Sequence, residues 1–395
     1  MTVPLRRSRN LSEANWPTIS VVTPSFNQGE YLDACIRSVL DQAYPRLEYF
    51  VLDGGSTDAS RAVIERHASR LSGWRCEPDA GQAAAIAEGF ARASGEILAW
   101  INADDLLEPG ALRRVAEAWR AVPDAVAWTG EVLRVDARGE PLGAWRGLTR
   151  GARELLLLGN SIPQQGTFMN ARAVARAGGV DAGLRYVMDF DLWVRLSMQG
   201  AWARIDGPAL ARFRYHGESK SVSQSGAFFD ELERTVFARP PATELLSGDE
   251  LELARARNAL RRLHEEIQSG DTEAARRSLD RALAARRWPW GDAEQTARRI
   301  VDYQGLAGHR LDAAGVEAAL EVVAPSTAWP AAVAPLRRAI RLRHALRRAA
   351  DAAASGRRLQ ALGAIVVTLI LSPRRMLDRS VMRRLVWALT GLGSP

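Results

Sequence analysis

Residues 96–107 read EILAWINADDLL, a strongly apolar run that ends abruptly in Asn102-Ala103-Asp104-Asp105. The apolar half predicts a buried strand, which places two adjacent carboxylates at the carboxyl end of that strand. Two carboxylates are costly to bury unless a cation neutralises them. A hard divalent ion, Mg²⁺ or Mn²⁺, suits carboxylate oxygens and leaves coordination positions for phosphate oxygens and water. The alternative, which these residues leave open, is that the Asp pair caps the helical segment that follows.

This run is the last of four strand-like segments that alternate with amphipathic helical segments. The strands are predicted at residues 18–23, 47–53, 74–77 and 96–102, and the helices at residues 30–42, 58–70 and 82–93. Repeated βα units indicate a mainly parallel sheet with helices on both faces, so the predicted fold class is α/β.

A polar cluster follows each of these strands. The clusters are Thr23–Asn27, Asp53–Asp58, Pro78–Gln82 and Asn102–Asp105. In a parallel sheet the carboxyl ends of the strands meet at one edge, and ligands bind there. The sequence therefore predicts a binding site that is built from all four clusters.

The next part of the chain adds strands and one further helix to this pattern. A hairpin is predicted at residues 125–145, a loop and strand at 161–170, a helix at 186–199 and a single strand at 201–215. Trp100, Trp193 and Trp202 have apolar neighbours, which favours positions in the core.

After about residue 227 the sequence becomes helical and rich in Ala, Arg and Leu. Residues 270–283 and 353–373 each resemble a helix-turn-helix repeat, but a tetratricopeptide-like array needs at least three such units. The longest apolar run, residues 361–371, is too short to span a membrane, since that requires roughly 20 residues. A small helical domain that buries this run is the prediction.

Composition and charge narrow the function classes. The chain has 395 residues, 47% of them hydrophobic, which is enough for two or three domains. Two cysteines provide no disulfide framework and favour a reducing compartment. The first residues lack the apolar segment of a signal peptide. Together these features predict a cytoplasmic protein.

The positive charge lies mostly in the tail. The net charge is +7, but residues 331–395 hold 13 Arg and 2 Asp, so the preceding 330 residues sum to −4. The Arg-rich helices could bind an anionic membrane surface, or their Arg side chains could face water while Leu, Val and Trp387 pack inward. Nearly all of the positively charged residues are Arg, so the high isoelectric point reflects a general preference for Arg in this sequence. No nucleic-acid partner is expected.

Five separated motifs resemble the family-2 inverting glycosyltransferases of GT-A fold. In chain order they are ISVVTPSFNQGEYLDACIRSVLDQ, YFVLDGGSTD, DAGQ, EGFARASGEILAWINADD and MDFDLWVRL, and the resemblance extends over residues 17–221. It implies a GT-A Rossmann-like domain at residues 17–226, after an N-terminal extension at 1–16 and before a helical region at 227–395.

The resemblance also implies an activity. Such enzymes move a sugar from a nucleoside-diphosphate donor to an acceptor hydroxyl, with a divalent metal, in the synthesis of polysaccharides, glycolipids or glycoproteins. The expected partners are a nucleotide sugar and a carbohydrate or lipid-linked acceptor, the latter at the inner face of a membrane. The alternative is a non-catalytic relative that binds nucleotide sugars and recruits a partner through its helical tail.

The resemblance assigns roles residue by residue. Asp189 would be the general base, and Asp105 the metal ligand, with Asn102 at the place of the first carboxylate of the family's acidic motif. Asp53 would accept a hydrogen bond from the imide N–H of the base, which favours uracil or thymine. The nucleotide would be bound by Thr23, Pro24, Ser25, Asp53, Asp79, Gly81 and Asp104. The acceptor and diphosphate would be bound by Gln164, Gln165, Asp191, His216 and Lys220.

Asp191 also has a local explanation. It lies four residues before Arg195 on the predicted helix, a spacing at which opposite charges pair. The residue before Asp189 is commonly Glu in the family and is Met188 here, so a neighbouring charge that could tune the base is absent.

Overall fold

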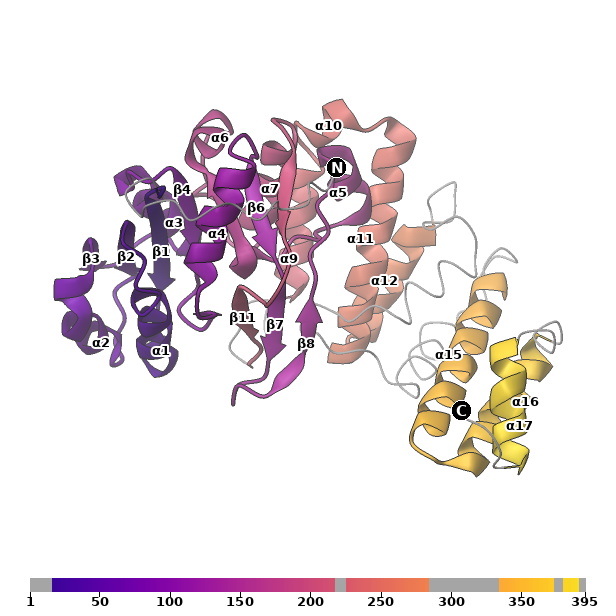
Figure 1. The fold of residues 1–395 in the computed structure, drawn as a ribbon. Coiled ribbons are helices and arrows are strands. Elements are labelled where there is room, and N and C mark those ends of the chain that lie inside the picture. Colours follow the sequence, from indigo (N-terminus) through magenta and orange to yellow (C-terminus); the bar gives the residue numbers. More distant parts are fainter. Residues whose placement is uncertain (1–15, 217–224, 284–333, 373–378, 391–395) are drawn as a thin grey trace. The chain divides into compact units, whose positions relative to one another are not determined.

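The computed structural model describes residues 16–216, 225–283, 334–372 and 379–390. It divides into two compact units, Met1–Ser247 and Gly248–Pro395 (Figure 1).

The first unit is built on a seven-stranded sheet in the order β10-β6-β9-β4-β1-β2-β3. Only β9 runs antiparallel to its neighbours, so the sheet is mainly parallel, and the predicted α/β class is confirmed. The strands are β1 (Ile19–Ser25), β2 (Leu47–Asp53), β3 (Gly73–Cys76), β4 (Ile97–Trp100), β6 (Ala127–Gly130), β9 (Thr167–Asn170) and β10 (Trp202–Ile205).

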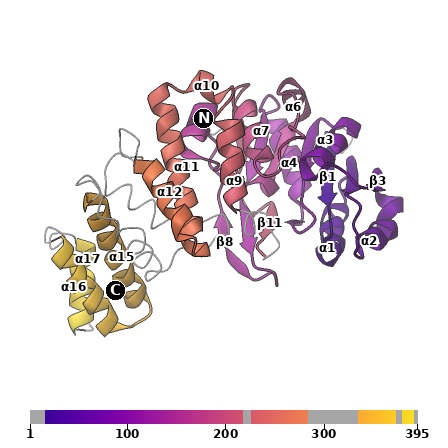
Figure 2. The same cartoon turned by 180° about the vertical axis from the view of Figure 1, so that it is seen from behind.

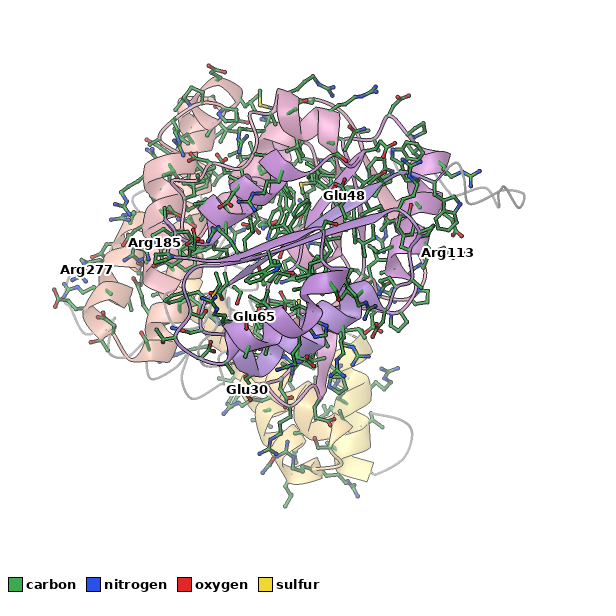
Figure 3. The ribbon with its side chains drawn as sticks, turned by 90° about the vertical axis from the view of Figure 1, so that its left-hand side faces the viewer. Glu30, Glu48, Glu65, Arg113, Arg185 and Arg277 are labelled. Carbon is green, nitrogen blue, oxygen red and sulfur yellow. The ribbon has the colours of Figure 1, made fainter. Side chains whose placement is uncertain are left out.

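Helices cover both faces of this sheet because strand side chains alternate in direction. Val21 of β1 joins the core formed with α1 (Gly29–Leu40), α2 (Ser60–His67) and α4 (Ala111–Ala121). The neighbouring Val22 points to the other face, where it lies against Gly89 of α3 (Gln82–Arg92). The covering helices point charged side chains such as Glu30, Glu65 and Arg113 outward (Figure 3).

A second, four-stranded sheet has the order β5-β11-β7-β8. Its strands are β5 (Leu106–Leu107), β7 (Val132–Val135), β8 (Pro141–Trp145) and β11 (Ala211–Arg214). Strands β11, β7 and β8 lie side by side in Figure 1, and β8 and β11 are seen from behind in Figure 2. The hairpin predicted at residues 125–145 is formed by β7 and β8 alone, since Ala127–Gly130 is β6 of the large sheet. The single strand predicted at residues 201–215 is wrong. Gly207, with φ +112°, and Pro208 interrupt it, so β10 enters the large sheet and β11 the small one.

Helix α7 (Met188–Ser197) packs on the large sheet through tryptophans. Trp193 stacks on Trp100 of β4 with ring centroids 5.6 Å apart, and meets Trp202 edge-on at 5.5 Å. All three rings are buried, as predicted. The remaining elements of the unit are α5 (Ala152–Leu158), α6 (Ala171–Arg176), α9 (Ser225–Glu231), a π-helix at Leu232–Val236 and α10 (Ala242–Leu245).

The second unit is helical in its described residues. Helices α11 (Gly248–Ser269) and α12 (Thr272–Leu283) pack against each other across a short turn at Gly270, where φ is +77°. Helices α15 (Ala334–Ala354), α16 (Arg358–Leu371) and α17 (Arg379–Thr390) surround a small core rich in alanine. The boundary predicted at residue 226 stays a prediction.

The prediction that the apolar run at residues 361–371 is buried holds for only one face of α16. Ala361, Ala364 and Ile365 are buried, whereas Val366 is 45% and Ile370 72% exposed. The sequence pattern was misleading because this helix is apolar on both faces. In the described parts of the chain, no helix has both the length and the apolarity that crossing a membrane demands.

Candidate active site

The acidic turn after β4 is held by side chains and backbone from three elements. Asp105 is fully buried, and its Oδ1 accepts a hydrogen bond from the backbone N–H of Arg214, at 3.0 Å. Its Oδ2 accepts from the side-chain amides of Asn102, at 3.1 Å, and Gln165, at 3.0 Å. Burial and the charge of Asp104 raise the pKa of Asp105 well above its usual value. A nearby cation would relieve this electrostatic cost.

Asp104 is the more accessible carboxylate of the pair. Its Oδ2 lies 2.8 Å from Nε2 of His216, and its side chain is 14% exposed against 5% for His216. The His216 ring packs on Tyr31 with centroids 5.0 Å apart. Strand β11 thus returns His216 to the acidic turn, and its predicted contact with a diphosphate stays a prediction. Lys220, predicted in the same loop, lies outside the described residues.

The two glutamines that were predicted to contact the acceptor or diphosphate make different contacts. Gln164 donates to the carbonyl of Trp100 at 2.7 Å and accepts from Asn102 at 3.3 Å, so it braces the end of β4. Gln165 donates to Asp105, but its buried Oε1 has no hydrogen-bond partner among the described residues. Gln165 therefore keeps an acceptor for a ligand.

Two of the predicted nucleotide residues use their side chains inside the protein. The hydroxyl of Thr23 lies 2.9 Å from the Tyr49 hydroxyl in the core. The carboxylate of Asp53 is fully buried and accepts from the N–H groups of Gly55 and Ser56, at 3.1 and 2.8 Å, and from the Ser56 hydroxyl, at 2.6 Å. Their predicted contacts with a nucleotide stay predictions.

Asp79 and Gly81 form a turn at the end of β3. Asp79 accepts from the Gly81 N–H at 2.8 Å, and Gly81 has φ +111° at the N-cap of α3. Arg75, which the sequence analysis missed, donates to Asp79 at 2.8 Å, to the Asp53 carbonyl at 2.8 Å and to Glu88 at 2.8 Å. No spacing rule predicts these contacts, because Arg75 lies in strand β3 and Asp79 in the turn that follows it.

The end of β1 carries side chains that suit a planar ligand. Pro24 and Ser25 are buried there, and the Ser25 hydroxyl lacks a hydrogen-bond partner among the described residues. The next side chain, Phe26, is 61% exposed. A Cβ at Gly54 would lie 3.4 Å from the Phe26 ring and 3.1 Å from Oδ1 of Asp79. An exposed aromatic ring beside a carboxylate suits a nucleobase, and the sequence analysis missed it.

Asp189 opens helix α7 and has no ion-pair partner among the described residues. Its Oδ2 accepts from the side-chain amide of Asn160 at 2.9 Å, and its Oδ1 accepts from the Phe190 N–H at 2.7 Å. Burial raises the pKa of Asp189 to about 6. A carboxylate with such a pKa is a better proton acceptor than an ordinary Asp and remains largely ionised at pH 7.

One short segment joins Asp189 to the acidic turn. Asn160 contacts Asp189 at one end of the segment, and Gln165 contacts Asp105 at the other. Asn160 and Gln165 are five residues apart in the sequence, so their Cα atoms lie at most about 18 Å apart. Trp193, one helical turn after Asp189, stacks on Trp100, which precedes the acidic turn. These two connections limit the distance between Asp189 and the acidic turn.

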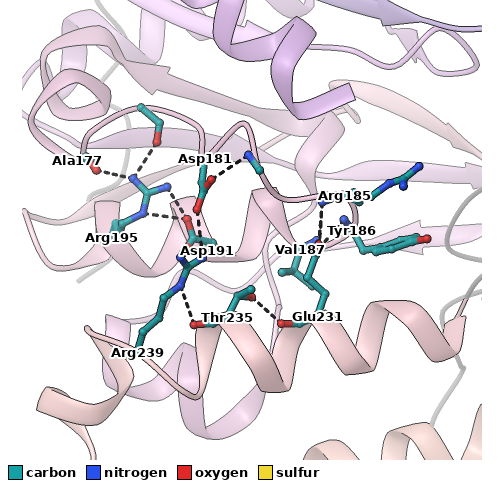
Figure 4. Close-up of polar contacts among 12 residues, drawn as sticks. Ala177, Asp181, Arg185, Tyr186, Val187, Asp191, Arg195, Glu231, Thr235 and Arg239 are labelled. Atoms are coloured by element: carbon teal, nitrogen blue, oxygen red, sulfur yellow. Dashed lines mark hydrogen bonds and ion pairs between the residues drawn. The ribbon is translucent and has the colours of Figure 1, made fainter. Parts of the chain in front are cut away.

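Asp191 has a structural role. It pairs with Arg195 at 2.5 Å, as its spacing predicts, and the same guanidinium donates to the carbonyls of Ala177 and Gly179 (Figure 4). This pair ties α7 to the end of α6. Its predicted place in the acceptor loop stays a prediction.

Comparisons with known proteins find similar chains. Residues 20–175 match the family model Glycosyl transferase family 2. An uncharacterized glycosyltransferase of Mycobacterium tuberculosis is 30% identical over 185 residues, which cover 46% of this chain and 70% of the relative. TuaG of Bacillus subtilis, a glycosyltransferase named for teichuronic acid biosynthesis, is 27% identical over 236 residues, which cover 57% of this chain and 92% of TuaG.

A solved structure is similar at lower sequence identity. S. aureus TarS 1–349 in complex with UDP-GlcNAc has a TM-score of 0.49 and 13% identity, and the alignment covers 82% of this chain and 90% of that chain.

Proposed function

Because this chain belongs to glycosyl transferase family 2, we propose that it transfers a hexose from a UDP- or dTDP-linked donor to an acceptor hydroxyl, with inversion at the anomeric carbon. The observation that carries the proposal is Asp189, whose pKa is raised to about 6 by burial and which one short segment connects to the acidic turn. Inversion requires the acceptor to attack from the side opposite the leaving diphosphate. A base and a diphosphate site within this limited distance of each other allow that geometry.

The residues divide into two roles. Asp189 takes the proton of the acceptor hydroxyl as the bond to the anomeric carbon forms. His216, when protonated, places positive charge beside Asp104, where the diphosphate of the donor would lie. Phe26, Ser25 and Asp79 support a nucleobase at the other end of the donor, with the ring of Phe26 as a stacking surface.

The acidic turn fits a divalent metal. Asp104 and Asp105 provide carboxylate oxygens, and the raised pKa of Asp105 reflects a buried carboxylate that a cation would stabilise. The described residues contain no group of three or more His, Cys, Asp or Glu that could hold a metal ion, so donor phosphates and water would complete the coordination. When bound, Mg²⁺ or Mn²⁺ would neutralise the charge that develops on the leaving diphosphate.

The nucleotide specificity is tested by thermal unfolding with UDP, dTDP, GDP and ADP, each with and without Mn²⁺. At 100 times its Kd a ligand stabilises a protein by about 2.7 kcal/mol, which raises the Tm of a domain this size by roughly 5 to 10 °C. We expect this shift with UDP or dTDP in the presence of Mn²⁺. Equal shifts with GDP or ADP would contradict a uracil or thymine site.

We also propose that the second unit binds an anionic membrane surface, which would place the protein at the inner face of the membrane near a lipid-linked acceptor. Residues 334–372 and 379–390 contain 11 Arg and 1 Asp. One face of α16 exposes Leu359, Val366, Val367 and Ile370. The net positive charge of these segments opposes the pairing of two copies of the chain through this face. An anionic lipid surface would instead attract the Arg side chains. The side chains are all aliphatic, which suits acyl chains.

Co-sedimentation with vesicles tests the membrane proposal. We expect the full-length protein to bind vesicles that contain phosphatidylglycerol, and to bind them more weakly at high salt. It should not bind vesicles of phosphatidylcholine alone. The double variant Leu359→Ser/Ile370→Ser should lose this binding, while Leu142→Ser, an exposed leucine of β8, should keep it. Binding to neither vesicle, or concentration-dependent dimers that the double variant abolishes, would overturn the proposal.

A further inference from the structure

The start of α7 receives a carboxylate from another element of the fold. Glu231, the last residue of α9, is 7% exposed and points its side chain at the residues just before α7 (Figure 4). Its Oε2 accepts from the N–H groups of Tyr186 at 2.6 Å and Val187 at 3.0 Å. The N–H of Arg185 lies 2.9 Å from Oε1 and 3.2 Å from Oε2. One carboxylate therefore binds three consecutive backbone N–H groups.

These contacts lie at the entry to the helix. Arg185 and Tyr186 precede α7, and Val187 is its N-cap and provides no side-chain cap, so Glu231 binds the N–H group of the N-cap and the two N–H groups before it. A negative charge is also favourable at the positive end of a helix dipole. Glu231 forms no ion pair among the described residues, so these N–H groups are the partners that balance its charge.

Glu231 is itself fixed by the segment that follows. The Thr235 hydroxyl donates to the Glu231 carbonyl at 2.6 Å, within the π-helix that begins at Leu232. Arg239 donates to the Thr235 carbonyl at 2.9 Å and to Asp181 at 3.1 Å. The segment from Glu231 to Arg239 thus holds the loop before α7 at two separate points, Asp181 and residues 185–187.

We propose that Glu231 is a positioning residue for Asp189, because it fixes the place where α7 starts. Asp189 follows Val187 by only two residues, so a shift of the three bound N–H groups moves its carboxylate directly. The Asp191–Arg195 pair binds the carbonyls of Ala177 and Gly179, so it holds α7 on the side toward α6 and contacts none of the residues 185–187. This inference rests on the proposed role of Asp189 as the base.

The test compares steady-state kinetics of Glu231→Gln and Glu231→Asp with the full-length wild type. Gln keeps the size of the side chain, but its amide opposes the N–H groups of Tyr186 or Val187, while Asp keeps the charge and is shorter. We expect kcat to fall on the order of 10²-fold in Glu231→Gln and less in Glu231→Asp, because a misplacement of about 1 Å can cost this much. The KM and Kd for the donor nucleotide sugar should stay within about threefold.

Two further variants make the result decisive. Glu65→Gln makes the same change of side chain at an exposed glutamate of α2, which pairs with Arg61 at 2.9 Å, and it should keep a near wild-type kcat. Asp189→Asn tests the proposed function separately. Wild-type kcat in Glu231→Gln, combined with an inactive Asp189→Asn, would overturn the positioning role alone. A loss of donor binding in proportion to kcat would also overturn it, since that indicates general misfolding.

Discussion

Asp189→Asn is expected to lower kcat by about 10²–10⁴-fold, the usual contribution of a general base, while donor binding stays close to that of the wild type. Asn keeps the size of the side chain and can still accept from Asn160 or Phe190 through its single oxygen. It cannot take up the proton of the acceptor hydroxyl. Single-turnover transfer from a UDP-hexose, with donor Kd measured in parallel, would give both quantities.

The matched control is Asp191→Asn, two residues further along the same helix. Its carboxylate pairs with Arg195, so this variant should lose stability and keep kcat within a few-fold. The opposite pattern would make Asp191 the base. Donor binding without transfer or hydrolysis in the wild type, across hexose donors and acceptors, would instead favour the non-catalytic alternative.

The same base predicts a pH dependence. Because burial raises the pKa of Asp189 to about 6, and because the base must be deprotonated to act, kcat/KM should rise with pH and level off above that value. The charge of Asp191 contributes to this increase, so Asp191→Asn should move the acidic limb to lower pH. A profile without an acidic limb between pH 5 and 7 would contradict the assignment.

The second large effect is expected for Asp105→Asn. We predict a loss of activity on the order of 10²-fold and loss of the Mn²⁺-dependent part of the thermal stabilisation by nucleotide. The two carboxylate oxygens of Asp105 accept hydrogen bonds from three donors, whereas Asn has a single acceptor oxygen. One buried donor is then left unpaired, at a cost of about 1–3 kcal/mol.

Asp41→Asn is the matched control for this prediction. Asp41 is an exposed carboxylate at the C-cap of α1 that pairs with the exposed Arg70, so its substitution should change neither quantity. Retention of the full Mn²⁺ effect in Asp105→Asn would remove Asp105 from the metal site and leave it as a structural carboxylate of the turn.

Much of the first unit was predictable because its elements have clear local periods. The strand at residues 47–53 has the predicted bounds, and the strands predicted at 18–23, 74–77 and 96–102 differ by one or two residues at their ends. The pairing of Asp191 with Arg195 followed from helical spacing alone. The meeting of polar clusters at one edge followed from the rule for parallel sheets.

Other features of the site depend on contacts between distant parts of the chain. His216 meets Asp104 across 112 residues, and it does so only because Gly207 and Pro208 split the predicted strand and send β11 into a second sheet. Glu231, at the end of α9, binds the N–H groups of residues 185–187. Nothing in the sequence of α9 indicates that it contacts the start of α7. No local pattern encodes such pairs, since their positions are set by the packing of whole elements.

The sequence by itself determined the α/β class, the family and the residues available for chemistry, because side-chain period and motif order are local properties of the chain. Only the tertiary structure decided which carboxylates are buried and which backbone groups they bind. The pKa of Asp189 is raised to about 6 because packing removes water from around it, and burial of this kind is a property of the assembled fold.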